Sequence, residues 1–455
     1  MRERETTETD LSGVWGQSLA MGDPLVARVL QSPARELVDR IFILDHPLVI
    51  GRDPGPAGLA VADGRVSGKH AALFPDDHGA LHVRDLGSKN GTFVDGVRTA
   101  ETQLGEGALL RLGATLICIS RRGPTDPTLA EEPEQDLVGL SPRFRETVLE
   151  ARKGAMAPTP VLLLGASGTG KEGLARLVHR VSGRGGPFVA VNCATLGGEL
   201  ATAMLFGHER AAFTGANVAR KGFFRAAEGG TLFLDEVGEL PEDVQARLLR
   251  ALEQREVTPV GATTPSHVDV RVVAATNADL SAAVINRRFR GDLYARLAGW
   301  SIHVPLLRER REDVMRLARH FTGPDGLAFE VEAAERLVLH DWPFNVRELK
   351  QLVQRLAHDA VAPISIDRLP PPIAGLTPPP LPPAALLESK PAAAPLVRSP
   401  VSRLRARPPR DELLRVLELH AYNVSAVARE LDRDRKQIYR WLNQYGIALA
   451  EEPQD

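Results

Sequence analysis

The sequence predicts three folded units: an all-β sandwich, an α/β unit built on a parallel sheet, and a small all-α unit. The first observation behind this prediction is length, because 455 residues are too many for one hydrophobic core. The second is composition, since 43% apolar and 25% charged residues are typical of globular protein. The third is the way in which proline-rich and polar stretches divide the chain.

The longest of these stretches covers residues 370–400, where 11 of 31 residues are proline. Such a segment stays extended and cannot pack a core, so it is predicted to be a linker. A shorter polar break, RRGPTDPTLAEEPEQD, lies at 121–136. The expected boundaries are a tail at 1–23, a β unit at 24–120, a linker at 121–136, an α/β unit at 137–365, a linker at 366–402, a helical unit at 403–449 and a tail at 450–455.

Charge and hydropathy exclude several classes of protein. The formal net charge is -2, so any affinity for nucleic acid must be local. The start, MRERETTETD, lacks the apolar region of a signal peptide, and the longest apolar runs are too short to span a membrane. Cys118 and Cys193 have no metal-ligand spacing and are typical of buried thiols in a reduced compartment. We expect a cytoplasmic protein with no membrane partner.

Each unit has its own apolar pattern. The first contains β-rich runs separated by Gly, Asp and Asn-Gly signals, such as GALHVRDL and LLRLGATLICIS, which suits a β-sandwich. The second alternates short apolar runs (VLLLG, FVAVN, TLFLDE, VRVVAAT) with helical stretches, which indicates a parallel α/β sheet. The third has apolar residues three or four positions apart, from Leu413 to Leu442, as one buried face of a helical unit requires.

The segment VLLLGASGTGKE places G-x-x-x-x-G-K directly after an apolar strand. Gly165, Gly168 and Gly170 let the backbone close around phosphates, and Lys171 can reach the β- and γ-phosphates. The order of strand, loop and helix favours an ATP site over a glycine-rich turn without a ligand. Glu172 stands where a general P-loop has the hydroxyl that binds Mg²⁺.

A second apolar strand, TLFLDEV, ends in Asp235 and Glu236. Beside a P-loop, this acid pair suits a Walker-B site, in which Asp235 holds the Mg²⁺ and Glu236 orients water as general base. The alternative is a solvated acid pair at the end of a strand. Together the two motifs predict an ATPase that uses ATP and Mg²⁺.

Seven motifs in the second unit occur in a particular order: GASGTGKE, FGHERAAFTGA, GGTLFLDEV, VRVVAATN, FRGDLYARL, PLLRERRED and WPFNVREL. Together they resemble the AAA+ domain of bacterial enhancer-binding proteins, the activators of sigma-54 RNA polymerase. The resemblance covers nearly all of 137–365 and implies an α/β subdomain at 137–305 and a helical lid at 306–365. In that family a glutamate follows the P-loop lysine, so Glu172 favours the assignment.

The resemblance implies roles for further residues. Asn192 would hold the Walker-B glutamate until ATP is sensed, and Thr276 and Asn277 match sensor I. Arg290 and Arg296 would reach the γ-phosphate of a neighbouring subunit, so that hydrolysis depends on assembly from a dimer to a ring, expected to be a hexamer. The remaining nucleotide contacts that it implies are Val138, Gly139, Ala166, Ser167, Thr169 and, as sensor II of the lid, Arg347.

The stretch FGHERAAFTGA resembles the GAFTGA loop with which this family touches sigma-54. Ala211 stands where glycine is usual, and alanine lacks the easy access of glycine to positive φ. We expect the alanine to be tolerated. A second departure is Phe344, where the family usually has glycine. The expected sigma-54 contacts are Ala211, Ala212, Phe213, Thr214, Gly215 and Ala216.

In the first unit, VIGRD, VSGKHAAL and DLGSKNGTFVDG resemble a forkhead-associated (FHA) domain, a β-sandwich that binds phosphothreonine peptides. Arg52 and Ser67 would hydrogen-bond the phosphate, and Lys69 would add positive charge. Asn90 would hold the peptide backbone. The expected partner is a phosphothreonine-containing protein. The alternative is a β-domain used only to pack the ring.

The segment HAYNVSAVARELDRDRKQIYRWLNQYGI resembles a Fis-type helix-turn-helix. Residues 403–449 contain 10 Lys and Arg against 6 Asp and Glu, a local excess of +4 that suits contacts with DNA phosphates. The alternative is a three-helix dimerisation piece. The expected contacts with double-stranded DNA are Arg433, Arg435, Lys436, Gln437, Tyr439 and Arg440.

The combined expectation is a multidomain protein with an all-β FHA sandwich, an α/β AAA+ P-loop domain with a helical lid, and an all-α helix-turn-helix. Its expected function is that of an ATP-driven activator that remodels sigma-54 RNA polymerase at the promoter. The alternative function is a DNA-binding AAA+ regulator that no longer couples to sigma-54. A generic AAA+ remodeller would explain the P-loop but not the FGHERAAFTGA stretch.

Overall fold

The computed structural model describes residues 25–121 except 57 and 77–78, residues 137–375 except 214–215, 217, 324–326 and 359–362, and Tyr445. Thr214 and Gly215 of the predicted sigma-54 contact therefore lie outside the described residues. So do all six predicted DNA contacts: Arg433, Arg435, Lys436, Gln437, Tyr439 and Arg440. The chain divides into two compact units, 1–386 and 387–455. No helix in the described part is long and apolar enough to cross a membrane.

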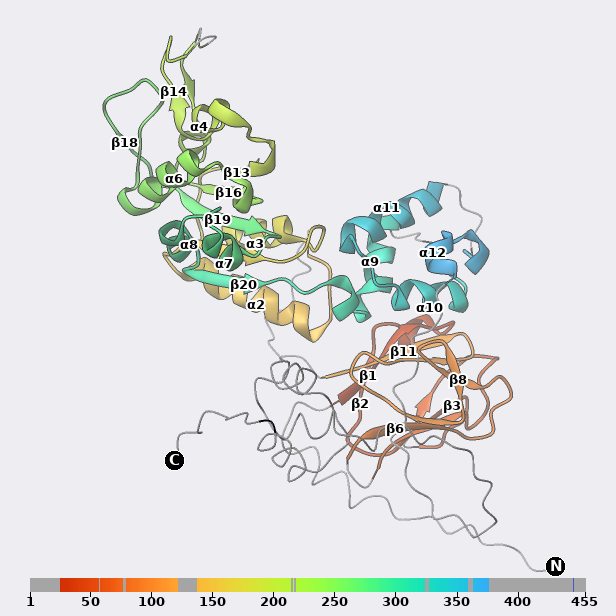
Figure 1. The fold of residues 1–455 in the computed structure, drawn as a ribbon. Helices are drawn as coiled ribbons and strands as arrows, with labels where there is room; N and C mark the ends of the chain where they lie inside the picture. Colours follow the sequence, from red (N-terminus) through yellow and green to blue (C-terminus); the bar gives the residue numbers. More distant parts are fainter. Residues whose placement is uncertain are drawn as a thin grey trace, which may run out of the picture. The chain divides into compact units, whose positions relative to one another are not determined.

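Residues 25–121 form the predicted β-sandwich of two sheets, drawn in red to orange in Figure 1. One sheet has the order β2-β1-β11-β10-β7-β8 and the other β4-β3-β5-β6-β9. The strands are β1 (Leu25–Gln31), β2 (Ile41–Ile43), β3 (Leu48–Gly51), β4 (Leu59–Ala60), β5 (Ala71–Pro75), β6 (Leu81–Asp85), β7 (Thr92–Val94), β8 (Val97–Thr99), β9 (Glu101–Gln103), β10 (Leu109–Leu112) and β11 (Thr115–Arg121).

Alternate residues of the sandwich strands point into its core. Leu48 and Ile50 of β3 and Leu73 of β5 are buried together with Leu110 and Ile117 from the opposite sheet. This period of two is the pattern expected where two sheets pack face to face. The loops at the ends of the strands are left free to carry recognition residues.

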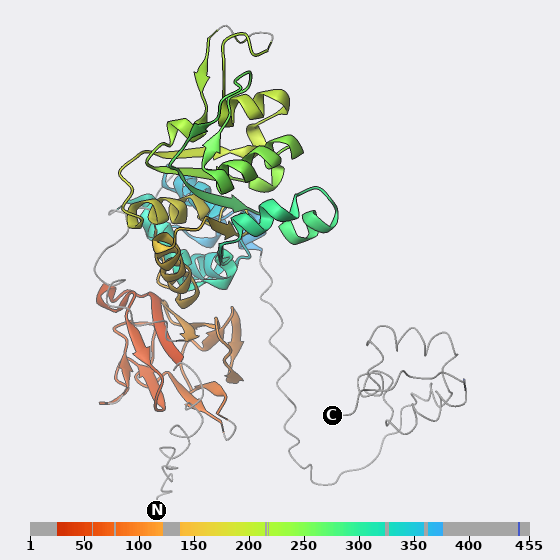
Figure 2. The same cartoon turned by 90° about the vertical axis from the view of Figure 1, so that its left-hand side faces the viewer.

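The second region contains the predicted parallel sheet, in the order β13-β16-β19-β12-β20. Its strands are β12 (Val161–Leu164), β13 (Phe188–Asn192), β16 (Thr231–Asp235), β19 (Arg271–Thr276) and β20 (Trp300–His303). Figures 1 and 2 show helices on both faces of this sheet. They are α2 (Pro142–Met156), α3 (Lys171–Val181), α4 (Gly198–Phe206), α5 (Phe223–Ala226), α6 (Glu242–Gln254), α7 (Leu280–Ile285) and α8 (Gly291–Leu297).

Helices on both faces explain why the strands read as unbroken apolar runs rather than alternating ones. In β12, Val161 and Leu163 face α2 and α3, where they pack with Phe144 and Leu174. Leu162, between them, belongs to a separate buried cluster that includes residues of α4, α6 and α8. Both faces of one strand are therefore core.

A helical lid follows the sheet, as the resemblance implied, but it extends past the predicted end at 365: Leu369 and Ile373, which the sequence placed in the linker, are buried in its core. It consists of α9 (Glu312–Thr322), α10 (Val331–Leu339), α11 (Asn345–His358) and the short α12 (Pro371–Ala374). Trp342, which is 1% exposed, packs in the lid core and donates from its indole nitrogen to the carbonyl oxygen of Leu337 at 2.9 Å. The buried tryptophan thereby fixes the turn before α11.

Two small β-pairs extend from the α/β domain. Strands β14 (Gly207–His208) and β15 (Arg220–Lys221) form the base of a finger that projects beyond α4 (Figure 1). Strands β17 (Glu256–Val257) and β18 (Ser266–His267) form the second pair. The finger carries the FGHERAAFTGA stretch, and its base is fixed by Phe206 and Phe224, whose rings stack with centroids 5.5 Å apart.

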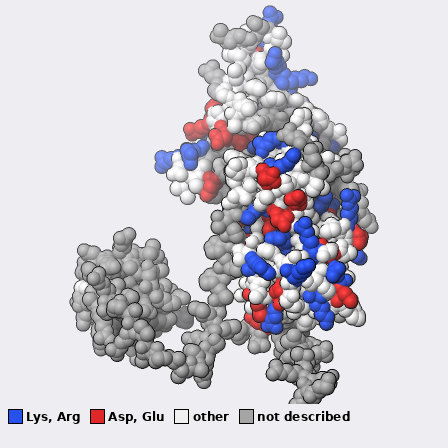
Figure 3. Space-filling view, turned by 90° about the vertical axis from the view of Figure 1, so that its right-hand side faces the viewer, with Lys and Arg blue, Asp and Glu red and all other residues white. Residues whose placement is uncertain are grey.

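One face of the described surface mixes the two charge signs. On the face shown in Figure 3, Lys and Arg are interspersed with Asp and Glu, without an extended region of one sign. This face of the described residues therefore offers no broad electrostatic footprint for a nucleic acid.

Candidate functional site

The parallel sheet brings the predicted nucleotide residues to one edge. Strands β12, β16 and β19 are adjacent and parallel, so their carboxyl ends lie side by side. The P-loop follows β12, the acid pair Asp235–Glu236 ends β16, and Thr276 ends β19. The carboxyl edge of an open α/β sheet is the usual place for a ligand.

The P-loop backbone has the geometry of an anion site. Gly168 and Gly170 both have positive φ, 78° and 106°, which places the start of α3 at Lys171. No side chain caps this helix, so its first amide groups remain available to an anion. The hydroxyl of Thr169 donates to the carbonyl oxygen of Ala166 at 2.9 Å and tightens the loop.

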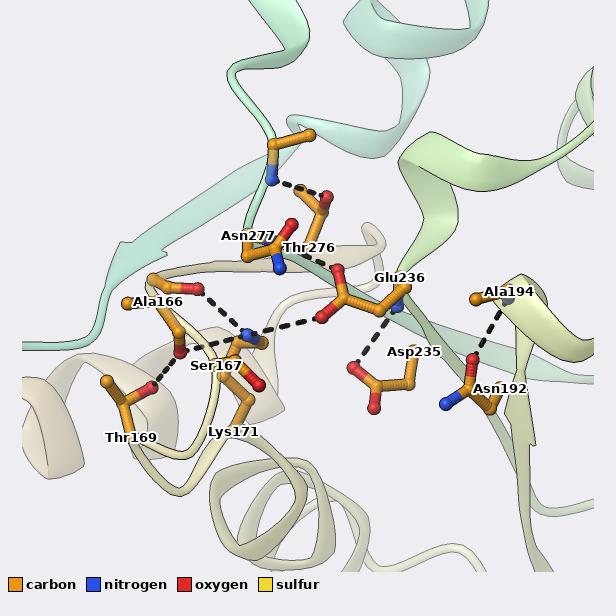
Figure 4. Close-up of polar contacts among 12 residues, drawn as sticks. Ala166, Ser167, Thr169, Lys171, Asn192, Ala194, Asp235, Glu236, Thr276 and Asn277 are labelled. Carbon is orange, nitrogen blue, oxygen red and sulfur yellow. Dashed lines mark hydrogen bonds and ion pairs between the residues drawn. The ribbon is translucent and has the colours of Figure 1, made fainter. Parts of the chain in front are cut away.

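Lys171 is the buried cation of the site and is only 6% exposed. Its ammonium group donates to the carbonyl oxygens of Gly165 (2.8 Å) and Ala166 (3.2 Å), and lies 4.0 Å from Glu236 Oε1 (Figure 4). Burial lowers the pKa of Lys171, and the carboxylates of Glu236 and Asp235 act in the opposite direction. The lysine therefore bonds to the loop that would hold phosphates.

The acid pair lies opposite this lysine. Glu236 has a positive φ of 53°, a strained conformation for a residue other than glycine and one that is often found at functional sites. Its carboxylate accepts from the backbone nitrogen of Asn277 at 3.0 Å, and Asp235 Oδ1 accepts from the backbone nitrogen of Glu236 at 3.1 Å. Burial, with a smaller contribution from Glu236, raises the pKa of Asp235.

This donor set fits a nucleotide with its metal ion. The uncapped helix and Lys171 suit phosphates, and Asp235 offers one carboxylate. The described residues contain no group of three acidic, His or Cys side chains that could hold a metal alone. Magnesium in nucleotide sites is commonly held by one or two carboxylates together with phosphate oxygens, so the single carboxylate here is sufficient.

The lid touches the P-loop through the start of α11. Arg347 donates to the hydroxyl of Ser167 at 2.8 Å, and the backbone nitrogen of Val346 donates to the carbonyl oxygen of Gly168 at 3.0 Å. Asn345 donates to the carbonyl oxygen of Ser167 at 3.0 Å and accepts from the backbone nitrogen of Leu307 at 2.9 Å. The helix therefore joins the loop to the segment before α9.

Sequence reasoning assigned no role to Asn345 or Arg310. Arg310 is 1% exposed and donates to the carbonyl oxygen of Thr169 at 2.9 Å, with its guanidinium carbon 4.4 Å from the ring centre of Phe144. Both residues lie within the quoted motifs WPFNVREL and PLLRERRED. Membership of these motifs was therefore the only sequence signal for the two residues. For Arg310 the signal is weak, because a charged residue among other charged residues is usually exposed on the surface.

Four predicted nucleotide residues make other contacts in this structure. Asn192 accepts from the backbone nitrogen of Ala194 at 3.0 Å, so its amide caps a short helix and makes no described hydrogen bond with Glu236. Glu172 is exposed and pairs with Arg176 at 2.7 Å. The other two are Val138, which packs against the lid core, and Gly139, whose missing Cβ would meet Phe144 and Asp313.

The predicted trans-acting arginines lie on or beside α8, away from the described contacts of Lys171. Arg290 forms a two-point ion pair with Asp292, at 3.1 and 2.7 Å. Arg296 is exposed and donates to the carbonyl oxygen of Leu252 at 3.2 Å. In a single chain these side chains do not meet the P-loop, which is the arrangement that a role in a neighbouring subunit requires.

The finger holds Ala211 in the left-handed region, at φ 64°. Its backbone nitrogen donates to the carbonyl oxygen of Ala216 at 2.8 Å, and Ala216 donates to Phe213 at 3.0 Å. The ring of Phe213 lies against His208, with centroids 5.0 Å apart. The position therefore has the backbone conformation that favours the glycine usual in the family, and alanine adopts it at some cost. Phe344, by contrast, is exposed and has no positive φ.

The FHA loops bring their predicted residues together. The backbone nitrogen of Arg52 donates to the carbonyl oxygen of Ser67 at 2.9 Å. The hydroxyl of Ser67 accepts from the backbone nitrogen of Lys89 at 3.1 Å. Asn90 donates to the carbonyl oxygen of Arg65 at 2.6 Å, while Lys69 is exposed on the same loop as Ser67. Ser67, Lys69 and Asn90 lie on two recognition loops, one before β5 and one before β7, which meet at one end of the sandwich, and Arg52 lies on a third loop after β3.

Gly51 and His70 support the contact between these loops. A Cβ on Gly51 would lie 1.9 Å from the carbonyl oxygen of Gly68, so only glycine fits this close approach. His70 is fully buried, donates from Nε2 to the carbonyl oxygen of Gly91 at 3.2 Å, and accepts at Nδ1 from the backbone nitrogen of Ser67 at 3.1 Å. His70 therefore links the recognition loop before β5 to the one before β7 through buried hydrogen bonds.

Comparison with known proteins agrees with this geometry. A sigma-54 interaction domain matches residues 137–303, an FHA domain matches 48–113, and an AAA+ ATPase lid domain matches 308–380. The crystal structure of NtrX from Brucella abortus in complex with ADP covers 70% of this chain and 72% of its own, with 29% identity and a TM-score of 0.50.

Two curated relatives show different extents of similarity. The DNA-binding transcriptional regulator NtrC of Rhizobium meliloti (strain 1021) is 46% identical over 240 residues, and the chain spans about half the length of that protein (50%). The anaerobic nitric oxide reductase transcription regulator NorR of Aeromonas hydrophila is 34% identical over 467 residues, which cover 94% of this chain and 91% of NorR. With its FHA domain, AAA+ domain and lid, the chain belongs to the family of sigma-54-dependent transcriptional activators.

Proposed function

We propose that this protein hydrolyses ATP in a ring and uses the hydrolysis to remodel sigma-54 RNA polymerase for promoter opening. The observation that carries the proposal is the convergence of Lys171, Asp235 and Glu236 at one sheet edge, in a domain that also carries the finger. Mg²⁺ with ATP would supply a polarised γ-phosphate when bound. Glu236 would orient the attacking water, and Asp235 would hold the metal.

Hydrolysis would depend on assembly because the arginines lie away from their own P-loop. Arg290 and Arg296 would each approach the nucleotide of a neighbouring subunit, where a cation stabilises the charge of the transition state. Asp292 holds Arg290 in place until that contact forms. Homo-oligomers from a dimer to a ring, expected to be a hexamer, would follow.

The finger would contact sigma-54 through the residues from Ala211 to Ala216. Phe213 is half-buried against His208 at the base of the finger. A movement of the finger would expose its apolar ring to sigma-54. The alternative function, a regulator that has lost the sigma-54 contact, is favoured by one observation. Ala211 has the positive φ that glycine would adopt more easily, so the loop is stiffer than usual.

The FHA domain would bind a phosphothreonine-containing protein and control assembly. Arg52 and Ser67 would hold the phosphate, Lys69 would add charge, and Asn90 would bind the peptide backbone. Residues 403–449 would bind double-stranded DNA upstream of the promoter, because they carry the local basic excess. Binding of DNA would place the ring at its target promoter, and binding of the phosphoprotein would set when the ring assembles.

The ATPase rate of the full chain tests the assembly step. If the arginines act between subunits, the rate per chain rises with protein concentration, and Arg290→Ala lowers it while leaving ADP binding intact. Asp292→Ala is the comparison variant: it removes the partner of Arg290 but keeps the cation, so the rate per chain should keep its dependence on concentration. A rate that is independent of concentration and unchanged by Arg290→Ala would refute the proposal.

A further inference from the structure

The FHA sandwich shares a buried core with the AAA+ lid. Both lie within the compact unit 1–386. Leu30, Leu109 and Leu116 of the sandwich belong to the same buried cluster as Met315 of α9 and Val331 of α10. Packed apolar side chains from both sides are typical of a fixed interface rather than of a mobile tether.

Charged groups surround this apolar contact on the α9 side. Arg316 and Arg319 of α9 both reach the carboxylate of Asp39, at 2.9 and 3.2 Å. Arg319 also donates to the carbonyl oxygen of Leu30 at 3.1 Å. One acid of the sandwich thereby binds two successive turns of the lid helix.

A second set of contacts joins the sandwich to α10. Arg111 of β10 lies 3.1 Å from Glu335, a lid carboxylate that is only 4% exposed. Gln31, at the end of β1, donates to the carbonyl oxygen of Phe329 at 2.9 Å. An acid buried this deeply needs its partner, because an unpaired carboxylate in such a place is strongly destabilising.

The turn that leads into α9, residues 310–313, is held from both domains. Arg310 donates to the P-loop residue Thr169, as described above. The next residue, Arg311, donates to Asp95 at 3.2 Å and to the carbonyl oxygen of Gly107 at 3.0 Å, both in the sandwich. Asp313 accepts from the backbone nitrogen of Ser141 at 2.9 Å, at the start of α2. Neighbouring residues of one turn thus contact the FHA domain and the nucleotide loop.

The phosphopeptide loop is tied to the same face of the sandwich. Asp63, which is 3% exposed, accepts from the backbone nitrogens of Arg65 (2.9 Å) and Ala114 (2.6 Å). Ala114 lies in the turn between β10 and β11, the strands that contact the lid. Asn90 donates to the carbonyl oxygen of Arg65, so both recognition loops are linked to this turn.

We propose that the FHA domain docks on the lid as a coupling element, joining its phosphopeptide loops to the P-loop through the turn at 310–313 that leads into α9. The proposal rests on the proposed phosphothreonine binding for its ligand at the FHA end. Docking holds Arg311, and Arg311 fixes the turn from which Arg310 reaches the P-loop. Undocking releases that turn and weakens nucleotide binding, and by linkage phosphopeptide affinity depends on the nucleotide.

Titration of ADP into the full chain tests the docking. Arg316→Glu with Arg319→Glu places two acids against Asp39, on side chains that are 37% and 35% exposed and so do not fill the lid core. We expect ADP affinity to fall at least about fivefold, within the usual range of coupling between sites. The control is Arg84→Glu, which breaks an exposed FHA ion pair with Glu101 on the other sheet and leaves ADP affinity unchanged.

Circular dichroism checks that each variant is folded. If the double variant does not fold, Asp39→Asn replaces it, because asparagine tolerates the φ of 68° at this position and only the charge is lost. A folded variant that binds ADP as tightly as the unaltered chain overturns the proposal.

A second experiment tests the coupling to phosphopeptide. A degenerate phosphothreonine peptide library and its unmodified counterpart are titrated into the full chain with and without ADP. We expect the affinity for the phosphorylated library to change with ADP, and this dependence to vanish in Arg316→Glu with Arg319→Glu. Equal affinity in both conditions overturns the coupling. Failure to bind any phosphorylated peptide removes the proposed FHA function instead, and the ADP titration still decides the docking.

Discussion

Arg347 of the lid donates a hydrogen bond to the hydroxyl of Ser167 in the P-loop at 2.8 Å, so the lid helix α11 and the phosphate loop are in direct contact. The two residues are far apart in sequence, and the family resemblance predicted nucleotide binding for both. Their contact places an exposed cation beside the phosphate loop, where a γ-phosphate could replace the serine hydroxyl as its partner.

Arg347→Ala is therefore expected to weaken ATP binding about tenfold and ADP binding much less, because a charge-assisted bond to the γ-phosphate is lost. Competition titrations with a fluorescent nucleotide would measure both affinities. Arg355→Ala provides the control, since Arg355 is exposed in the last turn of the same helix. Equal losses for ATP and ADP would show that Arg347 only supports the loop.

Gly168→Ala is expected to disrupt the contact between P-loop and lid. An added Cβ would lie 2.3 Å from the carbonyl oxygen of Phe344, at a position with φ 78°. Gly170→Ala is the matched control, because it also has positive φ but its Cβ would meet nothing within 4 Å. Both variants bear a left-handed cost of about 1–2 kcal/mol. Thermal unfolding should show a larger loss for Gly168→Ala, and equal losses would contradict the clash.

Asp235→Asn is expected to raise the midpoint of thermal unfolding at neutral pH while reducing ATP hydrolysis at least about a hundredfold. Burial raises the pKa of Asp235 above its ordinary value of 3.8, so the ionised carboxylate destabilises the folded, nucleotide-free chain. The folded state binds a proton more tightly than the unfolded state does. The penalty is full above the raised pKa and disappears as pH falls through it.

Unfolding measured at several pH values checks this sign. The stability advantage of Asp235→Asn should be greatest at neutral pH and shrink toward acid. An Asn variant that is less stable than the unaltered protein at neutral pH would mean that the attraction of Lys171 outweighs the burial of Asp235.

Ala211→Gly is expected to stabilise the protein by about 0.5–1 kcal/mol, because glycine adopts φ 64° without the alanine strain. Urea unfolding gives the free energy. Ala212→Gly is the control, as Ala212 has no positive φ and the change only adds freedom to the unfolded chain. A destabilised Ala211→Gly protein would show that the loop is relaxed with alanine.

The fold class follows from sequence because its signals are local. The apolar runs predicted the parallel sheet, and the buried faces of β12 explain why they are unbroken. The β-sandwich was predicted from β-rich runs separated by turn signals and the lid from the order of motifs, and comparison with known families confirms both.

Contacts between distant segments were not predictable in this way. Arg310 lies in a run of charged residues, and nothing local indicates that it is buried against the P-loop. The same holds for Asp39, whose two arginine partners lie nearly three hundred residues away. Such pairings depend on how the domains pack, which periodicity and spacing do not encode.

The most direct test of the central proposal is open-complex formation by sigma-54 RNA polymerase at a sigma-54 promoter, with the purified full chain and either ATP or a non-hydrolysable analogue. We predict open complexes with ATP only, and their loss in Phe213→Ala although that variant still hydrolyses ATP. Robust ATP hydrolysis by the unaltered chain without open complexes would contradict the account and favour a regulator that no longer couples to sigma-54.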